Sequence, residues 1–312
     1  MQQSMLKQSV KAFASRNFRI QKLVSLCMYV LLLDIAFIFL YPFLYMVITS
    51  FKSLADLNDV SVRWLLNEFC FDNYQAANKI LNYFPRLFNT VIGVSLCTLG
   101  HMLACSFIGY GFARYKFRGQ KFFFALLILS MIVPMQTIIV PIYILYSKIG
   151  IIPGQLPLIL PSFLGYGLKG TLFIFIFRQF FLSLPPSLEE AAAIDGCGPI
   201  KAFFKIALPT ARSSVLVCAV LSVVWHWNDF FEPTLYIQKQ SNYYLSLMLP
   251  TLYNLVNQAS TQTAQGDSAK LVYTAATMMA AIVMIILPLF LAYMVVQRKF
   301  MQGIETSGIT GE

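Results

Sequence analysis

The chain has 312 residues, of which 58% are hydrophobic and only 12% are charged. An ordinary soluble domain has roughly 25% charged residues, so this composition and a mean hydropathy of +0.68 exclude that class and indicate an integral membrane protein. The net charge of +10 comes from 23 basic minus 13 acidic residues. Because no basic patch interleaved with aromatic residues lies outside the segments that flank the apolar runs, the charge favours contact with lipid and argues against a nucleic-acid partner.

Six apolar runs are each long enough for the roughly 20 residues that a membrane-spanning helix requires. These runs are Leu23–Thr49, Leu87–Ala113, Phe122–Tyr146, Leu156–Leu182, Ser213–Ile237 and Val272–Val296. The fourth run contains prolines, glycines and Lys169 in its first half, so that half is expected to be broken or interfacial, with the regular helix beginning near Thr171. The sequence therefore predicts an all-α integral membrane protein with six transmembrane helices.

Basic residues orient these spans, because Lys and Arg accumulate in cytoplasmic loops. The segment 1–22 contains five basic residues and no acidic one, and segment 114–121 contains four basic residues and no acidic one. Both segments are expected in the cytoplasm, which places both termini and the loop between the fourth and fifth runs there as well. Asp34 lies inside the first run, where an unpaired carboxylate is costly, so it should face protein or water. A contact within an assembly and a place in a substrate path both remain open for Asp34.

A polar island separates the fourth and fifth runs. Pro185 and Pro186 should end the preceding helix, because proline lacks the N–H group that a helix interior requires. The four residues from Ser187 to Glu190 have the S-x-x-E form of a capping box. A short helix is therefore expected to begin near Leu188.

The end of this short helix is also marked. Gly196 stands where a helix terminus needs a residue that tolerates a positive φ, and Gly198 followed by Pro199 can start a second short helix. A helix of about eight residues is not stable alone in water, since isolated helices are marginal below roughly 12–15 residues. The island is therefore predicted to dock, and the small side chains of Ala191–Ala193 suit close approach to a partner groove.

The island also contains a longer pattern: E-A-A, three residues, G, nine residues and I-x-L-P. Its fixed positions are Glu190, Ala191, Ala192, Gly196, Ile206, Leu208 and Pro209. This pattern resembles the EAA loop of ABC importer permeases, in which a coupling helix docks into the ATPase subunit. Further motifs between about residues 40 and 304, among them P-M-Q at 134–136 and W-N-D-F-F at 227–231, are similar to the maltose-type carbohydrate permeases.

The resemblance implies a type I ABC importer permease in a bacterial cell membrane, which translocates a carbohydrate, in particular an oligosaccharide. It also implies four kinds of partner: a second homologous permease subunit, two ATP-binding subunits, an extracellular solute-binding protein and the lipid bilayer. The sequence contains no G-x-x-x-x-G-K-[ST] motif. No cofactor is therefore expected on this chain, and ATP would bind to the partner subunits.

Three segments are expected along the chain. Residues 1–86 would contain the cytoplasmic amino-terminal tail, the first span and an external loop; residues 87–297 would form the transmembrane domain, with the EAA loop at 187–209; and residues 298–312 would form a cytoplasmic tail. Gly303, Gly308 and Gly311 are spaced so that no helix should persist in this tail. The resemblance implies that Gln302 and Gly303 contact the ATPase, whereas a tail that merely ends the protein is the alternative.

The candidate substrate path lies near the outer end of the fifth run. Trp225, Trp227, Asn228 and Asp229 combine flat aromatic faces with hydrogen-bonding groups, which is the chemistry that sugars require. Tryptophan also anchors helices at the membrane interface, so anchoring and packing remain the alternative explanation for these residues.

Other functional classes have weaker support in the sequence. An importer of a non-sugar solute remains an alternative, and a secondary transporter would show related halves with matching broken helices, which are not evident. A membrane-embedded enzyme would need clustered catalytic groups, and none is apparent in the sequence. His101 and His226 are far apart in the sequence and are expected to pack between helices, so no metal site is predicted.

Overall fold

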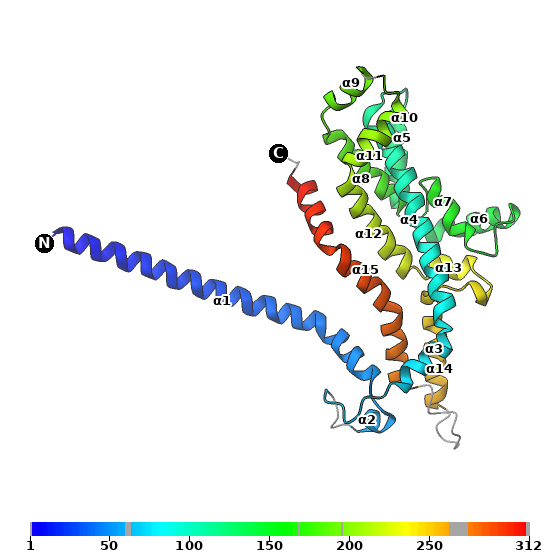
Figure 1. Ribbon diagram of the computed structural model, residues 1–312, viewed down its shortest axis with the longest axis horizontal. Coiled ribbons are helices and arrows are strands. Elements are labelled where there is room, and N and C mark those ends of the chain that lie inside the picture. Colours follow the sequence, from blue (N-terminus) through cyan, green and yellow to red (C-terminus); the bar gives the residue numbers. More distant parts are fainter. Residues whose placement is uncertain (1, 60–63, 168, 195, 262–273, 310–312) are drawn as a thin grey trace.

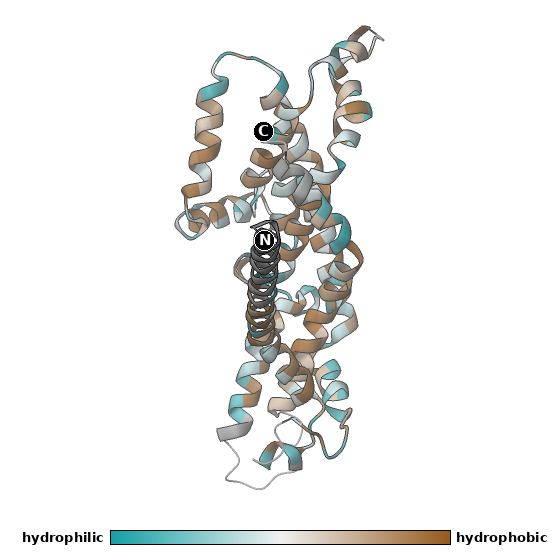
Figure 2. Cartoon of the chain, turned by 90° about the vertical axis from the view of Figure 1, so that its left-hand side faces the viewer, coloured by the Kyte–Doolittle hydropathy of each residue, from teal (hydrophilic) through white to brown (hydrophobic). Residues whose placement is uncertain are grey.

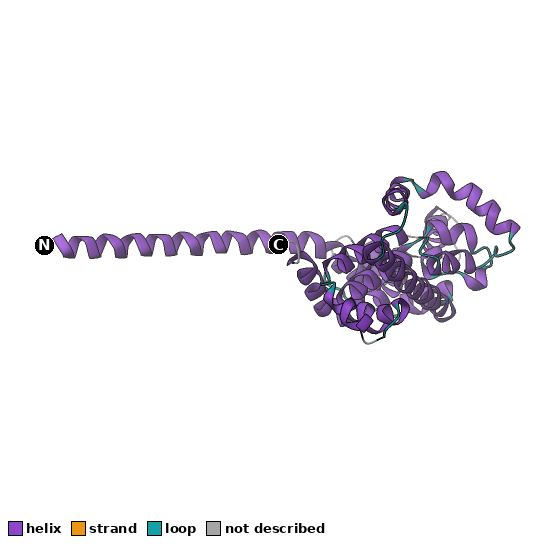
Figure 3. Cartoon of the chain, turned by 90° about the horizontal axis from the view of Figure 1, so that it is seen from above, coloured by secondary structure: helices purple, strands orange, loops and turns teal. Residues whose placement is uncertain are grey.

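The computed structural model of the chain describes residues 2–59, 64–167, 169–194, 196–261 and 274–309. Every regular element in these ranges is helical (Figure 3). The longest helices are α1 (Gln2–Ser50), α4 (Tyr83–Arg114), α12 (Arg212–Asn228) and α15 (Ala275–Ile309). The others are α2 (Leu54–Asn58), α3 (Asp72–Leu81), α5 (Gln120–Ile132), α6 (Met135–Lys148), α7 (Leu156–Phe163), α8 (Gly170–Ser183), α9 (Ser187–Ile194), α10 (Pro199–Ala202), α11 (Leu208–Thr210), α13 (Phe231–Tyr236) and α14 (Leu249–Thr261).

Helix α4 is the central element of the bundle. It packs most extensively against α8 and also contacts α7 and α12. One hydrophobic cluster joins α4 to α8 and α12 through residues such as Cys105, Phe177 and Cys218, all of which are fully buried. A second cluster joins α4 to α3, α12 and α15. The core therefore runs along α4, and both of its ends are positioned by contacts with several other helices.

Helix α1 differs from the rest of the molecule because most of its length projects away from the bundle (Figure 1). It contacts α15 near its carboxyl-terminal end. Its apolar segment Val24–Ser50 is almost wholly exposed within this chain. Hydrophobic residues predominate along the long helices, whereas hydrophilic residues gather near turns and helix ends (Figure 2).

Three described helices, α1, α4 and α15, are long and apolar enough to cross a membrane, and there are up to six spans if each bent helix pair counts as one. The third predicted run, Phe122–Tyr146, is not one continuous helix. It is divided into α5 and α6, which meet at an angle of 103°. Pro134 is the N-cap of α6 and has an extended conformation. Helix α5 ends before it, because proline lacks the N–H group that a helix interior requires and disfavours a helical conformation in the residue that precedes it.

The fourth and fifth runs differ in how well their bounds were predicted. The fourth run is broken as expected: α7 ends at Phe163 and the regular helix α8 begins at Gly170. The fifth run was predicted to reach Ile237, and this was wrong, since α12 ends at Asn228. There the Asp229 carboxylate accepts the N–H of Phe231 at 3.1 Å, which favours a turn over a further helical turn.

The carboxyl-terminal segment also corrects a prediction. The sixth run was expected to begin at Val272, which lies outside the described residues; α15 begins at Ala275 and continues to Ile309. The prediction that glycines would end the helix soon after Arg298 was therefore wrong. Gly303 is buried against α12, where an added Cβ would lie 3.3 Å from Val217 Cγ2. Close packing on α12 thus offsets the low helix propensity of this glycine.

Candidate functional site

The polar island forms a helix–turn–helix at one end of the molecule, where α9 is followed by α10 (Figure 1). Helix α9 begins at Ser187, one residue before the expected start. The N–H groups of Glu189 and Glu190 donate to the carbonyl of Pro186 at 3.0 and 3.1 Å. The described hydrogen bonds do not include the predicted capping box between Ser187 and Glu190, because this proline carbonyl already accepts the first N–H groups of the helix.

The turn after α9 has the predicted geometry. Gly196 adopts a φ of +73°, in the left-handed region that favours glycine. Its N–H donates to the carbonyl of Ala193 at 3.0 Å, and the N–H of Cys197 donates to that of Ala192 at 2.9 Å. An added Cβ at Gly196 would meet no atom within 4 Å, so the requirement for glycine is conformational. Pro199 then occupies the first position of α10, as expected.

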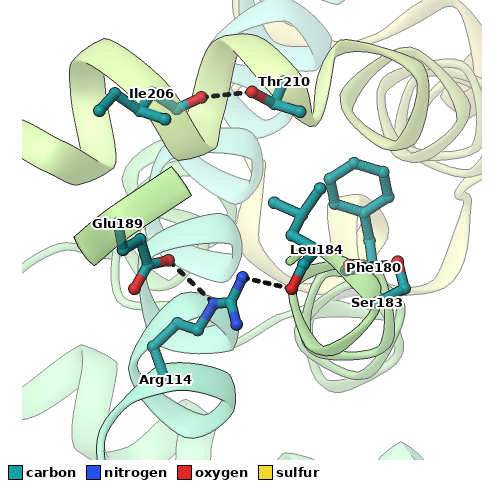
Figure 4. Close-up of polar contacts among 7 residues, drawn as sticks. All are labelled: Arg114, Phe180, Ser183, Leu184, Glu189, Ile206 and Thr210. Atoms are coloured by element: carbon teal, nitrogen blue, oxygen red, sulfur yellow. Dashed lines mark hydrogen bonds and ion pairs between the residues drawn. The ribbon is translucent and has the colours of Figure 1, made fainter. Parts of the chain in front are cut away.

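The I-x-L-P segment forms the elbow between α10 and α12. Residues Phe203–Ala207 make a π-helical turn, and Leu208–Thr210 make a single α-helical turn. The Thr210 hydroxyl donates to the Ile206 carbonyl at 2.7 Å (Figure 4). The segment from Pro199 to Thr210 meets α12 at an angle of 77°. Ile206, Leu208 and Pro209 therefore lie in the bend that joins the island to α12.

An ion pair fastens the island to the central helix. Arg114, the last residue of α4, places its Nε 2.8 Å from Glu189 Oε1 on α9 (Figure 4). Its Nη2 donates to the carbonyl of Leu184 at 2.8 Å. The two side chains of the ion pair are only 10% and 24% exposed. One guanidinium group therefore holds both the segment before α9 and the first turn of α9, and its planar fork suits such a double contact.

Aromatic packing supports the same junction. Tyr110 of α4 packs edge-on against Phe181 of α8, with ring centroids 5.3 Å apart. Its ring also lies 5.2 Å from that of Phe203 in the π-helical turn. All three side chains are buried. Aromatic pairs of this kind add about 0.5–1.5 kcal/mol beyond area burial, so α4, α8 and the elbow form one packed unit beneath the island.

The outward face of α9 is apolar although it lies on a polar element. Leu188, Ala191 and Ile194 are exposed and follow one another at intervals of three residues, which places them on the same side of the helix. Ile194 is 87% exposed. Ala192, in contrast, is only 4% exposed and packs inward, so the small face expected from Ala191–Ala193 is divided between the chain's own core and the surface. A contiguous exposed apolar face of this kind marks an interaction surface.

The predicted substrate-path residues do not converge on one point. Trp227 is buried and donates its Nε1–H to the carbonyl of Ile285 at 3.2 Å, which is a packing role. Asn228 is exposed and donates to the Val224 carbonyl on its own helix at 2.8 Å. Trp225 packs against Phe173 of α8 with ring centroids 5.7 Å apart.

Asp229 and Asp34 lie in different environments. Asp229 is half-buried in the wall of a cavity of about 540 Å³. Asp34 is exposed on the projecting part of α1. Asp229 alone of the five predicted substrate-path residues therefore lines this cavity.

The two histidines meet in the core. His101 on α4 and His226 on α12 have ring centroids 5.2 Å apart. His101 Nε2 lies 3.2 Å from the Tyr166 carbonyl, and His226 Nδ1 lies 2.8 Å from the Ser222 carbonyl. Both therefore pack between helices as predicted. In the part of the chain that the structure describes, no group of three or more His, Cys, Asp or Glu residues could hold a metal ion.

The membrane helices and the polar island agree with the comparison to protein families. Residues 105–306 match the family described as the binding-protein-dependent transport system inner membrane component. The chain belongs to this family. It is therefore a membrane component of a transport system, as the resemblance implied.

Named relatives of this permease extend the comparison. The chain is 28% identical to the arabinooligosaccharides transport system permease protein AraQ of Halalkalibacterium halodurans, over 89% of this chain and 93% of that protein. It is 30% identical to the diacetylchitobiose uptake system permease protein NgcG of Streptomyces coelicolor, over 83% of this chain and 80% of that protein.

A solved structure shares the fold of the permease. It is the crystal structure of a bacterial ABC transporter involved in the import of the acidic polysaccharide alginate, which aligns with a TM-score of 0.73 at 21% identity. The alignment covers 89% of this chain and 97% of that chain. This likeness supports the helical architecture of an importer permease.

Two features of the permease island were not found by sequence reasoning. The partners of Arg114 were missed because Glu189 lies 75 residues away along the chain, and only the folded α4–α8 pair brings the two side chains together. The exposed Ile194 was missed because the docking face was predicted only from the alanines of the E-A-A pattern. The apolar residue three positions after Ala191 was the available signal for this face.

Proposed function

We propose that this chain is a membrane-spanning permease subunit of an ATP-driven importer for a carbohydrate, in particular an oligosaccharide. The single observation that supports this most is the helix–turn–helix of α9 and α10, which combines the complete E-A-A…G…I-x-L-P pattern with an exposed apolar face. Relatives named for arabinooligosaccharides and diacetylchitobiose support the choice of carbohydrate.

The proposed partners are a second homologous permease subunit, two ATP-binding subunits and an extracellular solute-binding protein. In this assembly α9 is the coupling helix, and its exposed residues Leu188, Ala191 and Ile194 seat in a groove of one ATP-binding subunit. Glu190, also exposed on α9, offers a carboxylate at the edge of this contact. Closure of the two ATP-binding subunits would then move the island as one body, because Arg114 and the aromatic junction fasten it to α4 and α8.

The proposed orientation places both termini and the island in the cytoplasm. It follows from the basic residues in segments 1–22 and 114–121. Cysteine substitutions at the exposed Lys116 and at the exposed Glu68 test it, because the two positions should lie on opposite faces of the membrane. A membrane-impermeant thiol reagent added outside should label the Glu68 variant and leave the Lys116 variant unlabelled. The reverse pattern would overturn the orientation.

The carboxyl-terminal tail is proposed to contact an ATP-binding subunit through one of its two predicted residues. Gln302 is exposed and could reach an ATP-binding subunit, whereas Gly303 is packed on α12. We therefore assign the tail contact to the Gln302 side of α15.

Transport itself is tested by uptake. Cells that lack only this chain should fail to import one oligosaccharide that the parent strain imports, and the wild-type chain should restore uptake. Pull-down of the tagged chain should recover an ATP-binding subunit. Unchanged uptake of every oligosaccharide tested, or uptake without any ATP-binding subunit, would contradict the proposed function.

A further inference from the structure

A cavity with several polar side chains in its wall lies where three breaks in the helical runs meet. The residues that line it come from the α5–α6 elbow, from the segment between α7 and α8, and from the segment that follows α12. Its volume is about 540 Å³, within the roughly 300–1,000 Å³ of small-molecule sites in proteins. Gln136, Lys169, Asp229 and Glu232 supply charged or amide groups from these separate segments. The cavity is thus a convergence of polar groups on a protein of very apolar composition.

Lys169 is held in place by an unusual backbone. Its φ is +64°, a left-handed conformation that costs a non-glycine residue roughly 1–2 kcal/mol. The backbone before it also has positive φ at Gly165 and Gly167. The residue after Lys169 is Gly170, where no side chain fits, since an added Cβ would lie 2.6 Å from the Gly165 carbonyl oxygen. Strain of this kind persists only where the surrounding structure enforces it, and it is concentrated at functional sites.

The ammonium group of Lys169 is aimed by an aromatic ring. Its Nζ lies 5.8 Å from the centroid of the Trp225 ring, within the range of a cation–π contact. The Lys169 side chain is nevertheless exposed, and no described carboxylate lies within ion-pair distance of it. Its three N–H donors therefore remain available to a molecule in the cavity.

The facing wall presents a buried carboxyl group. Glu232 is only 7% exposed, yet among the described residues none forms a hydrogen bond or an ion pair with its carboxyl group. A largely buried carboxyl group in the wall of the cavity is placed to accept hydrogen bonds from a molecule bound there. Asp229 is in a different situation, because one of its oxygens already accepts the N–H of Phe231.

Two aromatic side chains complete the cavity. Tyr166 and Phe231 line it and are 41% and 40% exposed, which is high for rings inside a helical bundle. Flat apolar faces beside donors and acceptors match a sugar ring, whose C–H faces are apolar and whose hydroxyl groups both donate and accept hydrogen bonds. A purely apolar ligand would leave Lys169 and Glu232 unpaired.

We propose that this cavity binds one or two sugar units of an uncharged oligosaccharide on its way through the importer, with Lys169 donating to and Glu232 accepting from its hydroxyl groups. This inference rests on the proposed function, and it adds that this chain itself contacts the transported sugar. The uncharged class follows from the lining, to which Asp229 and Glu232 contribute two carboxyl groups and Lys169 a single ammonium group. A carboxylated sugar would therefore meet an excess of acidic groups.

Uptake by the complete importer, co-expressed with its own partner subunits, tests the proposal. The probes are radiolabelled arabinotriose and maltotriose, which are neutral, and trigalacturonate, which is acidic. Lys169→Met should lower uptake of the neutral trisaccharide by about tenfold, the effect of losing a charged hydrogen bond in the path. Lys148→Met is the matched control, because Lys148 is exposed at the end of α6 and does not line the cavity. It should import like the wild type.

Two substitutions at Glu232 distinguish the effect of hydrogen bonding from the effect of charge. Glu232→Leu should lower neutral uptake by about tenfold, whereas Glu232→Gln keeps an acceptor and should stay within about threefold of the wild type while raising uptake of trigalacturonate. Glu68→Gln, at an exposed position away from the cavity, is the matched control. Recovery of the intact complex in detergent shows that each variant assembles, and the solute-binding protein should bind its sugar with unchanged affinity.

The outcomes are distinct. If the wild-type importer takes up a neutral trisaccharide and Lys169→Met and Glu232→Leu do so equally well, this cavity is not in the path and the inference fails while the proposed function stands. If trigalacturonate is the preferred probe, the uncharged class is wrong. If the wild-type importer takes up none of these sugars or any other oligosaccharide, the proposed function itself fails, and the inference fails with it.

Discussion

The island of α9 and α10 and the segment between α7 and α8 are both breaks in the helical pattern, and both depend on glycines with positive φ. They differ in what surrounds those glycines. An added Cβ at Gly196 would meet open space, whereas an added Cβ at Gly165 would lie 2.6 Å from Ile108 Cδ1. The island is thus shaped by its own backbone and exposed for a partner. The cavity segment is shaped by the helices that enclose it.

Helix α8 connects these two regions. It begins at Gly170, beside the cavity, and ends at Ser183, just before α9. Its 14 residues span about 21 Å at 1.5 Å per residue. A displacement of the island can therefore reach the cavity through one packed helix. The comparison predicts that changes in the enclosed segment will be more damaging than changes in the exposed turn.

The largest effect is expected from Gly170→Ala. The new Cβ would lie 2.6 Å from a backbone oxygen that cannot move freely, and overpacking of this kind costs about 1–3 kcal/mol. At the upper end of that range the ratio of folded to unfolded chain falls roughly 100-fold, so the amount of assembled importer, and hence uptake, should fall at least several-fold. Gly111→Ala on α4 is the matched control, because its Cβ would meet no atom within 4 Å. Equal uptake by both variants would show that the cavity segment is not tightly enclosed.

A smaller effect is expected when the island is detached from α4. Arg114→Ala removes the ion-pair partner of Glu189 and the hydrogen bond to the Leu184 carbonyl. It should lower sugar uptake per ATP hydrolysed by about tenfold, since a hydrogen bond to a charged group contributes about 1.5–3 kcal/mol. Arg118→Ala, at an exposed position in the same loop, should have no effect. Exchange of the charges, Arg114→Glu with Glu189→Arg, should restore part of the coupling. If Arg114→Ala couples ATP hydrolysis to uptake normally and the charge-exchanged double variant does not improve coupling, the ion pair has no role in coupling.

The smallest effect is expected at the exposed turn. Gly196→Val forces a β-branched residue into a φ of +73°, at a cost of about 1–3 kcal/mol, and should leave membrane insertion intact while lowering uptake per ATP several-fold. Gly198→Val is the matched control, since Gly198 has a φ of −67° and an added Cβ would also meet no atom within 4 Å. Wild-type coupling in Gly196→Val would contradict a rigid turn between α9 and α10.

Local chemistry explains which features the sequence predicted. Gly196 and Pro199 act through their own backbone torsions, so the turn and the start of α10 were predicted correctly. The bounds of α12 and α15 were not, because Asp229 ends one helix through a side-chain contact and Gly303 is retained in the other by packing on Val217. A hydropathy pattern alone predicts neither of these two contacts.

The same distinction applies to the functional residues. The E-A-A pattern located the island, because its residues are close together in the sequence. The cavity was not found, since Lys169, Glu232 and Gln136 come from three separate segments and meet only after folding. Of the candidate substrate-path residues, Trp227 donates a buried hydrogen bond to the Ile285 carbonyl of α15, which favours the packing alternative for this residue.

In the proposed assembly, the outward face of α9 docks on an ATP-binding subunit. Pull-down of the tagged importer with Ile194→Asp measures this directly, because Ile194 is 87% exposed and contributes little to the fold of its own chain. Leu65→Asp, at an equally exposed position in the segment between α2 and α3, is the matched control. Ile194→Asp should recover at least about tenfold less of the ATP-binding subunit, as expected for a charge in the centre of an apolar contact, while Leu65→Asp should recover the wild-type amount. Recovery of the ATP-binding subunit with Ile194→Asp at the wild-type amount would contradict the claim.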